Sequence, residues 1–241
     1  MEWDEVVARV TPYVVKIETP TGHGTGFLCL YNDNKSFFRI ATALHVLSYA
    51  NEWQQPIRLH HYPSSTTMFI KASERIIFVD RDTDSAVILA HPGKLDLPDD
   101  SLALLPSSVS LAIGSEAGWL GFPGLAPSTL CFFQGSISAR QEHAYLIDGV
   151  AINGVSGGPV FFCSKAAGVQ IIGTVSAYFP NRAAGDTLPG LAIARDVSHF
   201  HDTIKRIQTF DEAIAKQQKQ EEEQAQKTQP SASSTSQEVP K

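Results

Sequence analysis

Hydrophobic residues along most of the chain occur in short runs rich in β-branched and aromatic residues, separated by turn-forming residues. In the first half these runs lie at 13–20, 27–31, 37–44, 57–62, 67–72, 75–79 and 85–90. Val, Ile, Phe and Thr favour strands, whereas Gly, Pro, Asn and Asp favour turns. Short apolar runs separated by turn-forming residues continue after residue 101. Many short strands at this spacing predict an antiparallel all-β protein, and 241 residues fit two small barrels, at about 12–100 and 101–197.

Helical periodicity occurs at both ends of the chain. Near the start, apolar residues at i, i+3, i+4 and i+7 predict a short helix, ended by Pro12, with the buried face Trp3, Val6, Val7 and Val10. Near the end, an apolar stripe predicts a helix at 199–216, N-capped by Ser198 and packed on the domain through Phe200, Ile204, Ile207, Phe210 and Ile214. Residues 217–241 are polar and are expected to form a mostly disordered tail, whose role as a tether or partner-binding segment stays open.

Charge and composition exclude several functional classes. The formal net charge is −6, whereas nucleic-acid-binding proteins usually carry a basic face. No apolar run reaches the roughly 18–20 residues that span a bilayer, and the acidic start lacks the basic segment of a secretory signal. The cysteines Cys29, Cys131 and Cys163 form no CxxC pair, which favours free thiols in a reducing compartment. We therefore expect a cytoplasmic protein with no nucleic-acid partner, membrane span, metal or cofactor.

The segment GVSGGPV at 154–160 places one serine, Ser156, among three glycines just before an apolar strand. Glycine permits unusual backbone angles and the close approach of another backbone. Such a turn can expose the serine hydroxyl as a nucleophile and direct the N–H groups of Gly154 and Ser156 at one point, as an oxyanion hole requires. Strands are predicted on both sides, which separates this turn from the nucleophile elbow of α/β-hydrolases, where a helix follows.

A base and an orienting carboxylate occur upstream of this serine. His45 stands where the apolar run of IATALHVLS ends, and Asp84 directly precedes the apolar run SAVILA. A catalytic triad needs a buried aspartate that accepts a hydrogen bond from the imidazole, whereas Asp80 and Asp82 are expected to serve turn chemistry. The order His45, Asp84, Ser156 is that of chymotrypsin, and it places the histidine and aspartate in the first barrel and the serine in the second.

With these residues in place, the chain resembles the trypsin-like serine peptidases, and among them the HtrA-like branch without its PDZ domain. The resemblance covers residues 6–198 and rests on GHGTGFL, IATALHV, TDSAVIL, WLGFPG and GVSGGPVF in that order. It implies two antiparallel β-barrels of the chymotrypsin type, and hydrolysis of protein or peptide substrates through an acyl-enzyme. By this resemblance His45 is the general base, Asp84 orients it and Ser156 is the nucleophile. The amides of Gly154 and Ser156 would form the oxyanion hole.

The resemblance also implies a specificity pocket. Its floor corresponds to Val150, and its wall to Ser176, Ala177 and Tyr178. None of these side chains offers a charge to pair with a charged substrate residue, so we expect cleavage after small or medium apolar residues. Tyr178 stands where large-pocket enzymes carry glycine and is expected to narrow the entrance. One departure is Val155, because the family usually has Asp or Asn before the nucleophile, and the zymogen-type lock of the oxyanion turn is therefore absent.

Two other functional classes are open at this point. A trypsin-like domain that has lost catalysis would act as an interaction module, and Val155 is the feature that favours this alternative. Acyl transfer on non-peptide esters is the other. Labelling with a fluorophosphonate separates an active serine from an inactive one, and digestion of a peptide library separates a peptidase from an esterase.

Overall fold

The computed structural model describes residues 1–31, 35–178, 181–183, 186–188 and 190–228. The chain divides into two compact units, Met1–Thr203 and Ile204–Lys241. The helices are α1 (Trp3–Val10), α2 (Leu44–Glu52) and α3 (Ser198–Thr228), with 3₁₀ helices at Thr11–Tyr13 and Ala72–Glu74. The strands are β1 (Val14–Thr19), β2 (Gly22–Tyr31), β3 (Phe38–Ala43), β4 (Ile57–His61), β5 (Thr66–Ile70), β6 (Arg75–Asp80), β7 (Ser85–Ala90), β8 (Ala103–Leu104), β9 (Glu116–Gly121), β10 (Cys131–Gln141), β11 (Ala144–Asp148), β12 (Pro159–Ser164), β13 (Gly168–Tyr178), β14 (Asn181–Ala183), β15 (Asp186–Leu188) and β16 (Ala192–Asp196).

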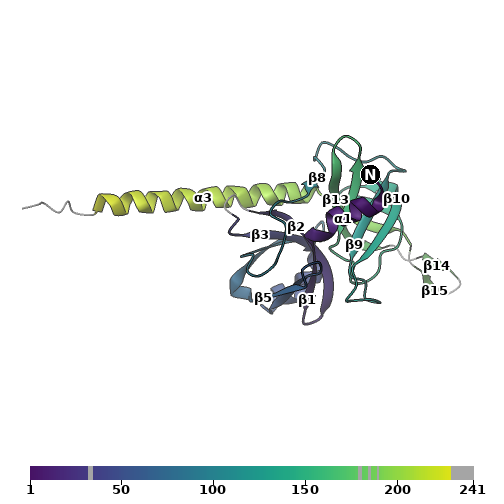
Figure 1. Ribbon diagram of the computed structural model, residues 1–241, viewed down its shortest axis with the longest axis horizontal. Coiled ribbons are helices and arrows are strands. Elements are labelled where there is room, and N and C mark those ends of the chain that lie inside the picture. The colour runs from purple at the N-terminus through teal and green to yellow at the C-terminus, as the bar shows by residue number, and fades with distance from the viewer. Residues whose placement is uncertain (32–34, 179–180, 184–185, 189, 229–241) are drawn as a thin grey trace, which may run out of the picture. The chain divides into compact units, whose positions relative to one another are not determined.

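The first sheet contains seven strands in the order β5–β4–β1–β2–β3–β7–β6, and every pair is antiparallel. Its strands β1, β2, β3 and β5 are labelled in Figure 1. Strand β7 is buried along its whole length, which matches its unbroken apolar run SAVILA. Strand β6 forms one edge and exposes Ile76 and Val79. Within the described residues no pairing joins the edge strands β5 and β6, so this sheet is a half-barrel.

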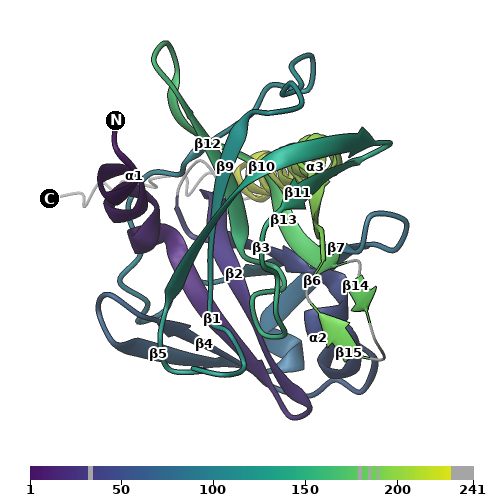
Figure 2. The ribbon, with the colours of Figure 1, turned by 90° about the vertical axis from the view of Figure 1, so that its right-hand side faces the viewer.

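The second sheet closes on itself. Its order is β12–β9–β10–β11–β16–β13–β8, and β12 also pairs with β13, so six strands form a ring to which β8 is added in parallel. Strands β1 and β2 of the first sheet lie beside β9 of the second, where the two sheets meet (Figure 2). The predicted all-β, chymotrypsin-type fold with a short N-terminal and a C-terminal helix is confirmed. The departure from two closed barrels lies in the first sheet.

Two elements near the site differ from the sequence prediction. A strand was expected to end at Leu44, but β3 ends at Ala43, and Leu44–Glu52 form the unpredicted helix α2, which buries Leu47 and Ala50. The segment at 21–27 was expected to be a turn, yet β2 already begins at Gly22. Its glycines provide room between packed neighbours, because a Cβ at Gly24 would lie 2.5 Å from Cγ2 of Val46.

Two differences concern the end of the chain. The short hairpin β14–β15 was not predicted, and α3 continues to Thr228, beyond the expected end at 216. The added helical segment consists mainly of Gln, Glu, Lys and Ala, which are strong helix formers. Residues 229–241 of the predicted tail lie outside the described residues. The packing of residues 199–216 on the domain stays a prediction.

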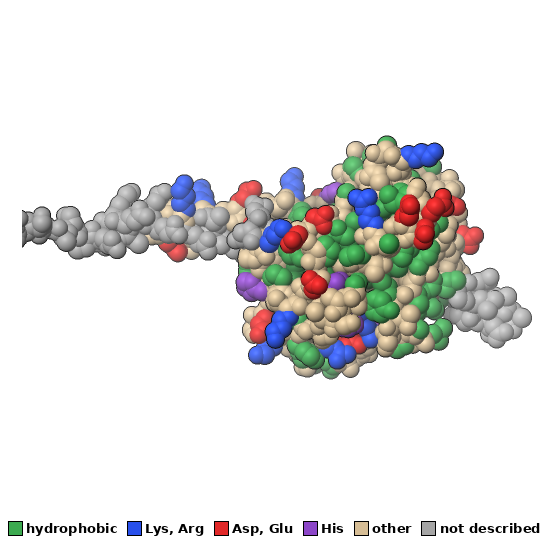
Figure 3. Space-filling model, viewed as in Figure 1, with side chains coloured by type: hydrophobic (Ala, Val, Ile, Leu, Met, Phe, Trp, Pro, Cys, Tyr) green, Lys and Arg blue, Asp and Glu red, His purple; other side chains and the backbone are tan. Residues whose placement is uncertain are grey.

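The start of α3 belongs to the first unit. The ring of Phe200 is fully buried and lies edge-on to that of Phe27 on β2, with 6.2 Å between their centroids. On the face drawn in Figure 3, acidic and basic side chains are interspersed with hydrophobic ones. Among the described helices, none is long and apolar enough to cross a membrane.

Candidate active site

His45 and Asp84 meet where β3 ends and β7 begins. The two strands pair antiparallel with Ala43 opposite Ser85, so the residue after β3 lies beside the residue before β7. The Asp84 carbonyl accepts a hydrogen bond from the Leu44 amide at 2.9 Å, and its Oδ1 accepts one from the His45 amide at 3.0 Å. Its Oδ2 lies 2.8 Å from Nδ1 of His45. Asp84 therefore fixes both the backbone and the ring of the histidine.

Ser176 completes the surroundings of the Asp84 carboxylate. Its hydroxyl donates to Oδ2 at 2.6 Å from β13 of the second barrel. Burial alone would raise the pKa of Asp84, but the hydrogen bonds from His45 and Ser176 outweigh it and hold this pKa below its ordinary value. An ionised Asp84 keeps the proton of His45 on Nδ1, which leaves Nε2 unprotonated and able to act as a base.

The two preceding aspartates have a different role. Oδ1 of Asp80 accepts hydrogen bonds from the amides of Asp82 and Thr83 at 3.0 and 3.2 Å, and Asp82 is exposed. The prediction that Asp80 serves turn chemistry is confirmed. The turn ends at Asp84, whose φ of 51° lies in the left-handed region, which Asp tolerates better than most residues.

The glycines around Ser156 are required by their conformation and by the lack of space. Gly154 and Gly157 have φ of 91° and 81°, in the left-handed region. A Cβ at Gly157 would lie 2.1 Å from Oγ1 of Thr42 and 2.2 Å from the carbonyl of Thr25. Any larger residue here would push the turn away from the first sheet.

Hydrogen bonds to carbonyl groups hold this turn in place. The Asn153 carbonyl accepts from the Gly124 amide at 2.7 Å, and the Ser156 carbonyl accepts from the Thr25 amide at 2.8 Å. Within the described part of the chain, the amides of Gly154 and Ser156 donate to no acceptor. Two adjacent N–H groups held in this way can stabilise an oxyanion.

The predicted triad residues line one cavity of about 420 Å³. It is formed by His45, Asp84, Ala151, Ile152, Asn153, Ser156, Val175, Ser176, Ala177 and Tyr178. No hydrogen bond joins the hydroxyl of Ser156 to His45 among the described contacts, although both residues line the same space.

The cavity includes the predicted wall residues but not the predicted floor residue. Val150 is 46% exposed and is not among the lining residues. The three residues that follow it, Ala151, Ile152 and Asn153, line the cavity instead, and sequence reasoning did not select them. Their position directly before the glycine turn is the signal that could have identified them.

Among the described residues that line this cavity, His45 is the one histidine, although His23 lies beside the serine turn, with its Nε2 3.0 Å from the Phe122 carbonyl. His60 and His61 lie on opposite faces of β4, and the buried His61 lies 2.8 Å from the Pro12 carbonyl. His199 is buried without a hydrogen-bond partner among the described residues. Across the described ranges, no group of three or more His, Cys, Asp or Glu residues could hold a metal ion.

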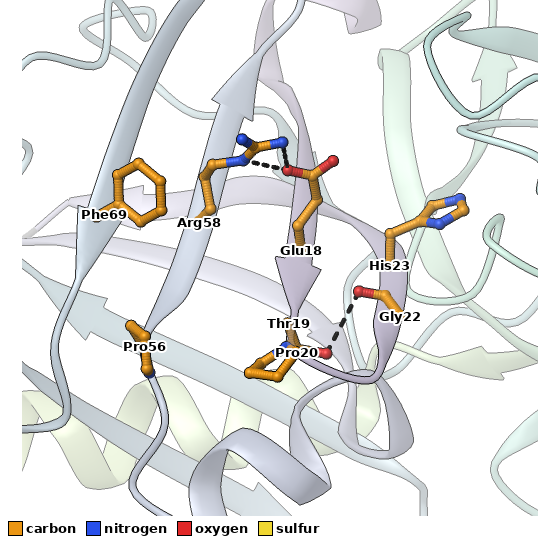
Figure 4. Close-up of a pocket in the computed structure, with 8 residues that line it drawn as sticks. All are labelled: Glu18, Thr19, Pro20, Gly22, His23, Pro56, Arg58 and Phe69. Atoms are coloured by element: carbon orange, nitrogen blue, oxygen red, sulfur yellow. Dashed lines mark hydrogen bonds and ion pairs between the residues drawn. The ribbon is translucent and has the colours of Figure 1, made fainter.

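A second cavity of about 420 Å³ lies beside the β1–β2 turn (Figure 4). Across four neighbouring strands, the register aligns Phe69, Arg58, Glu18 and His23. Arg58 forms an ion pair with Glu18, and its guanidinium lies 5.8 Å from the centre of the Phe69 ring. Burial would raise the pKa of Glu18, but Lys16 and Arg58 outweigh it and the pKa lies below its ordinary value. The charges of this cavity are therefore paired with one another.

Comparisons with known proteins agree with the fold. No protein-family model matches the chain, and no curated protein does. Among solved structures, Deg5 gives a TM-score of 0.61 at 21% identity, covering 86% of this chain and 94% of its own. A variant of the HtrA-type protease AlgW, solved with a decapeptide, gives 0.64 at 17% identity, covering 86% and 67%. Rv3671c of M. tuberculosis, in an inactive form, gives 0.58 at 20% identity, covering 85% and 90%. The chain therefore has the fold of HtrA-type, trypsin-like serine proteases.

Proposed function

We propose that the protein is a serine endopeptidase that hydrolyses peptide bonds through an acyl-enzyme. The observation that carries this proposal is the hydrogen-bonded His45–Asp84 pair in one cavity with Ser156. The amides of Gly154 and Ser156, which have no acceptor among the described residues, supply the donors that such a reaction needs.

The proposed reaction follows from these groups. Nε2 of His45 takes the proton of the Ser156 hydroxyl as the oxygen attacks the substrate carbonyl, and Asp84 stabilises the imidazolium that forms. The negative oxygen of the tetrahedral intermediate accepts hydrogen bonds from the two amides. The C–N bond then breaks, and the proton passes from His45 to the leaving amine. A water molecule, activated in the same way, releases the acyl group and restores the serine. No hydrogen bond from Ser156 to His45 is present among the described contacts, and we expect one to form when substrate binds.

The substrate preference is proposed from the cavity wall. Ala177 and Ile152 are apolar, and Tyr178 is 37% exposed at the cavity. None of these wall residues carries a charge, so a charged side chain packed against them would lose its hydration without a charged partner, which is costly. We propose cleavage after small or medium apolar residues such as Val, Ala, Ile or Leu.

The partners and the compartment are also part of the proposal. The partners are protein or peptide substrates, and the role of residues 217–241 is open. All three cysteines are free, and burial raises the pKa of the Cys29 thiol to about 12, so this thiol is unreactive. Free thiols support a reducing, cytoplasmic location.

One experiment tests the reaction. The protein is treated with a fluorophosphonate probe, the labelled residue is identified by mass spectrometry, and the products of a peptide-library digest are sequenced. We expect the label on Ser156 and peptide cleavage by the same preparation. The Ser156→Ala variant, with an unchanged fold, is the matched control and should show neither. A folded wild-type protein without label and without cleavage would exclude the peptidase.

The alternative function is an inactive trypsin-like interaction module. Val155 before the nucleophile is the feature that raises this alternative, but His45, Asp84 and Ser156 are all present in one cavity, and the comparisons do not favour an inactive domain. The same labelling experiment decides between the two functions, because an interaction module does not react with the probe.

A further inference from the structure

The turn at 154–156, which carries the two proposed oxyanion-hole amides, has no charged side chain at position 155 to hold it in shape. Val155, where related enzymes carry Asp or Asn, is completely buried. Its Cγ1 lies against Gly121, where an added Cβ would come within 2.8 Å. A valine side chain offers no hydrogen bond, so another group must fix the orientation of the Gly154 and Ser156 amides.

Thr25 on β2 supplies a side-chain hydrogen bond to this turn. It is completely buried, and its hydroxyl donates to the Gly154 carbonyl at 2.9 Å. The same oxygen accepts a hydrogen bond from the Phe122 amide at 3.1 Å. A threonine hydroxyl has a single proton, so acceptance from Phe122 directs that proton to Gly154.

The backbone of Thr25 adds two further hydrogen bonds. Its amide donates to the Ser156 carbonyl at 2.8 Å, and its carbonyl accepts from the Thr42 hydroxyl at 2.7 Å. All polar groups of Thr25 are therefore engaged, and they connect the first sheet with both ends of the turn at 154–156. Because threonine is branched at Cβ, its side chain also has few rotamers available.

The peptide planes explain why this contact matters. Three consecutive planes of the turn are held through their carbonyls: Asn153 by Gly124, Gly154 by Thr25, and Val155 by Gly158. In a trans peptide the N–H points away from the carbonyl of the same plane. A hydrogen bond that fixes the carbonyl of one residue therefore also fixes the direction of the N–H of the next residue, which points to the opposite side of the same peptide plane. The middle plane separates the two amides, and its rotation would misalign them.

We propose that Thr25 is the positioning residue of the oxyanion hole, and that its hydroxyl replaces the charged lock that Val155 lacks. This inference rests on the proposed peptidase function. Thr25 does not touch the substrate in this proposal. It acts by holding the Gly154–Val155 peptide, so its loss affects the transition state more than substrate binding.

The test compares Thr25→Val, Thr25→Ser and the wild-type protein on a chromogenic peptide substrate. Thr25→Val keeps the shape and removes the hydroxyl, and kcat should fall by about 10- to 100-fold, because deletion of a whole oxyanion donor costs more. KM should change by less than about threefold. Thr25→Ser keeps the hydroxyl and should stay within about fivefold of the wild-type kcat.

Two further measurements separate positioning from general stability. A peptide boronate, which mimics the tetrahedral intermediate, should bind Thr25→Val more weakly by the same factor as the loss in kcat/KM. Thr174→Val is the matched control, because Thr174 is an equally buried threonine whose hydroxyl has no partner among the described residues. It should leave kcat unchanged. If Thr25→Val does not fold, Thr25→Ala, which adds no methyl group at the hydroxyl position, takes its place.

The outcomes are distinct. A wild-type protein that fails to react with a fluorophosphonate overturns the proposed function and this inference with it. A reactive wild-type protein and a folded Thr25→Val variant with kcat and boronate affinity within twofold of it overturn this inference alone. A loss confined to KM and melting temperature would also overturn it, since that result describes a purely structural threonine.

Discussion

The two halves of the candidate active site are held in place by different means. In the half from the first sheet, the carboxylate of Asp84 accepts from the backbone amide and the ring of His45, and Ser176 donates a further hydrogen bond to it from the second barrel. In the half from the second barrel, the turn of Ser156 is fixed through its carbonyls, and no described residue accepts from the amides of Gly154 and Ser156.

This difference separates proton transfer from charge stabilisation. The groups that would move the proton are assembled before substrate binds. The groups that would meet the substrate oxygen are oriented from behind and left without an acceptor, as preorganised donors must be. Substitutions in the first half should therefore change the chemistry of the base, and substitutions in the second half should change the nucleophile, the donors or the pocket.

Removal of the nucleophile is expected to have the largest effect. Ser156→Ala should lower the rate of peptide hydrolysis by about 10⁶-fold, the scale known for the loss of a triad serine. The melting temperature should not change, because the turn is held through backbone carbonyls and Thr25. Initial rates and thermal unfolding measure both. A rate above about 1% of the wild type would contradict the assignment of Ser156.

Removal of the negative charge of Asp84, which orients the proposed base His45, should have the next largest effect on the rate. Asp84→Asn should reduce kcat by about 10⁴-fold, as in a trypsin-type triad, because an amide favours the wrong tautomer of His45. Asp80→Asn is the matched control, since its Oδ1 can still accept from the amides of Asp82 and Thr83. A larger loss at Asp82→Asn than at Asp84→Asn would show that the orienting carboxylate was misassigned.

Substitution of Tyr178 in the cavity wall should change the substrate preference by a smaller factor than the two losses in rate above. Tyr178→Gly removes the ring at the cavity and should increase cleavage after Phe relative to Val, by about 10- to 200-fold at most. Digestion of one peptide library by both proteins measures the ratio. Wild-type cleavage mainly after Lys, Arg, Asp or Glu would contradict this view of the pocket and leave the triad untouched.

The buried His199 should make the free energy of unfolding depend on pH, because charges from both sheets act on its imidazole. Burial lowers the pKa of His199 to about 4, although Asp196 and Asp80 act in the opposite direction, and His143 and Arg195 lower it further. The unfolded chain therefore binds this proton first. The free energy of unfolding should fall by up to about 3 kcal/mol as the pH decreases from 6.5 to about 4.

Urea unfolding of the wild-type protein and of His199→Leu at several pH values between 7 and 4 measures this contribution. The leucine variant should lose part of the pH dependence, because leucine binds no proton. Equal slopes in the two proteins would show that His199 does not titrate between the folded and unfolded states in this range.

Truncation of the tail is expected to have the smallest effect. Removal of residues 217–241 should leave the melting temperature and the hydrolysis rate nearly unchanged, because the segment has almost no apolar side chains to bury. Truncation near residue 198 is the contrasting variant and should destabilise strongly, since it deletes the buried Phe200. A drop of several degrees in the first variant would show that the tail docks on the domain.

The sequence predicted most strands and the residues of the candidate triad, because both leave local signals. The run SAVILA identifies β7 by composition alone, and three glycines around one serine indicate the turn of the proposed nucleophile. The early start of β2 could not be predicted, since its glycines are explained by Val46 and Ile17, which approach them in the folded chain. Tertiary contacts decide such positions, and local propensity does not.

The lining residues Ala151, Ile152 and Asn153 and the proposed role of Thr25 were missed for a related reason. The hydroxyl of Thr25 acts on Gly154, a residue 129 positions away in sequence. Nothing in the pattern GHGTGF indicates which carbonyl that hydroxyl reaches. Ile152 and Asn153 likewise look like ordinary loop residues until the fold brings them beside His45.

The open first sheet has a consequence for self-association. Strand β6 is an edge strand with exposed Ile76 and Val79, and such edges can pair with another chain. Charged residues stand at its two ends, Arg75 and Asp80. The guanidinium of Arg75 is tied to the carbonyls of Ile70, Ala50 and Gln55, so the charge is fixed at the entrance of the strand. Charged residues that flank an apolar strand disfavour β-aggregation, and we expect Arg75 and Asp80 to have this effect at the β6 edge when the protein is concentrated.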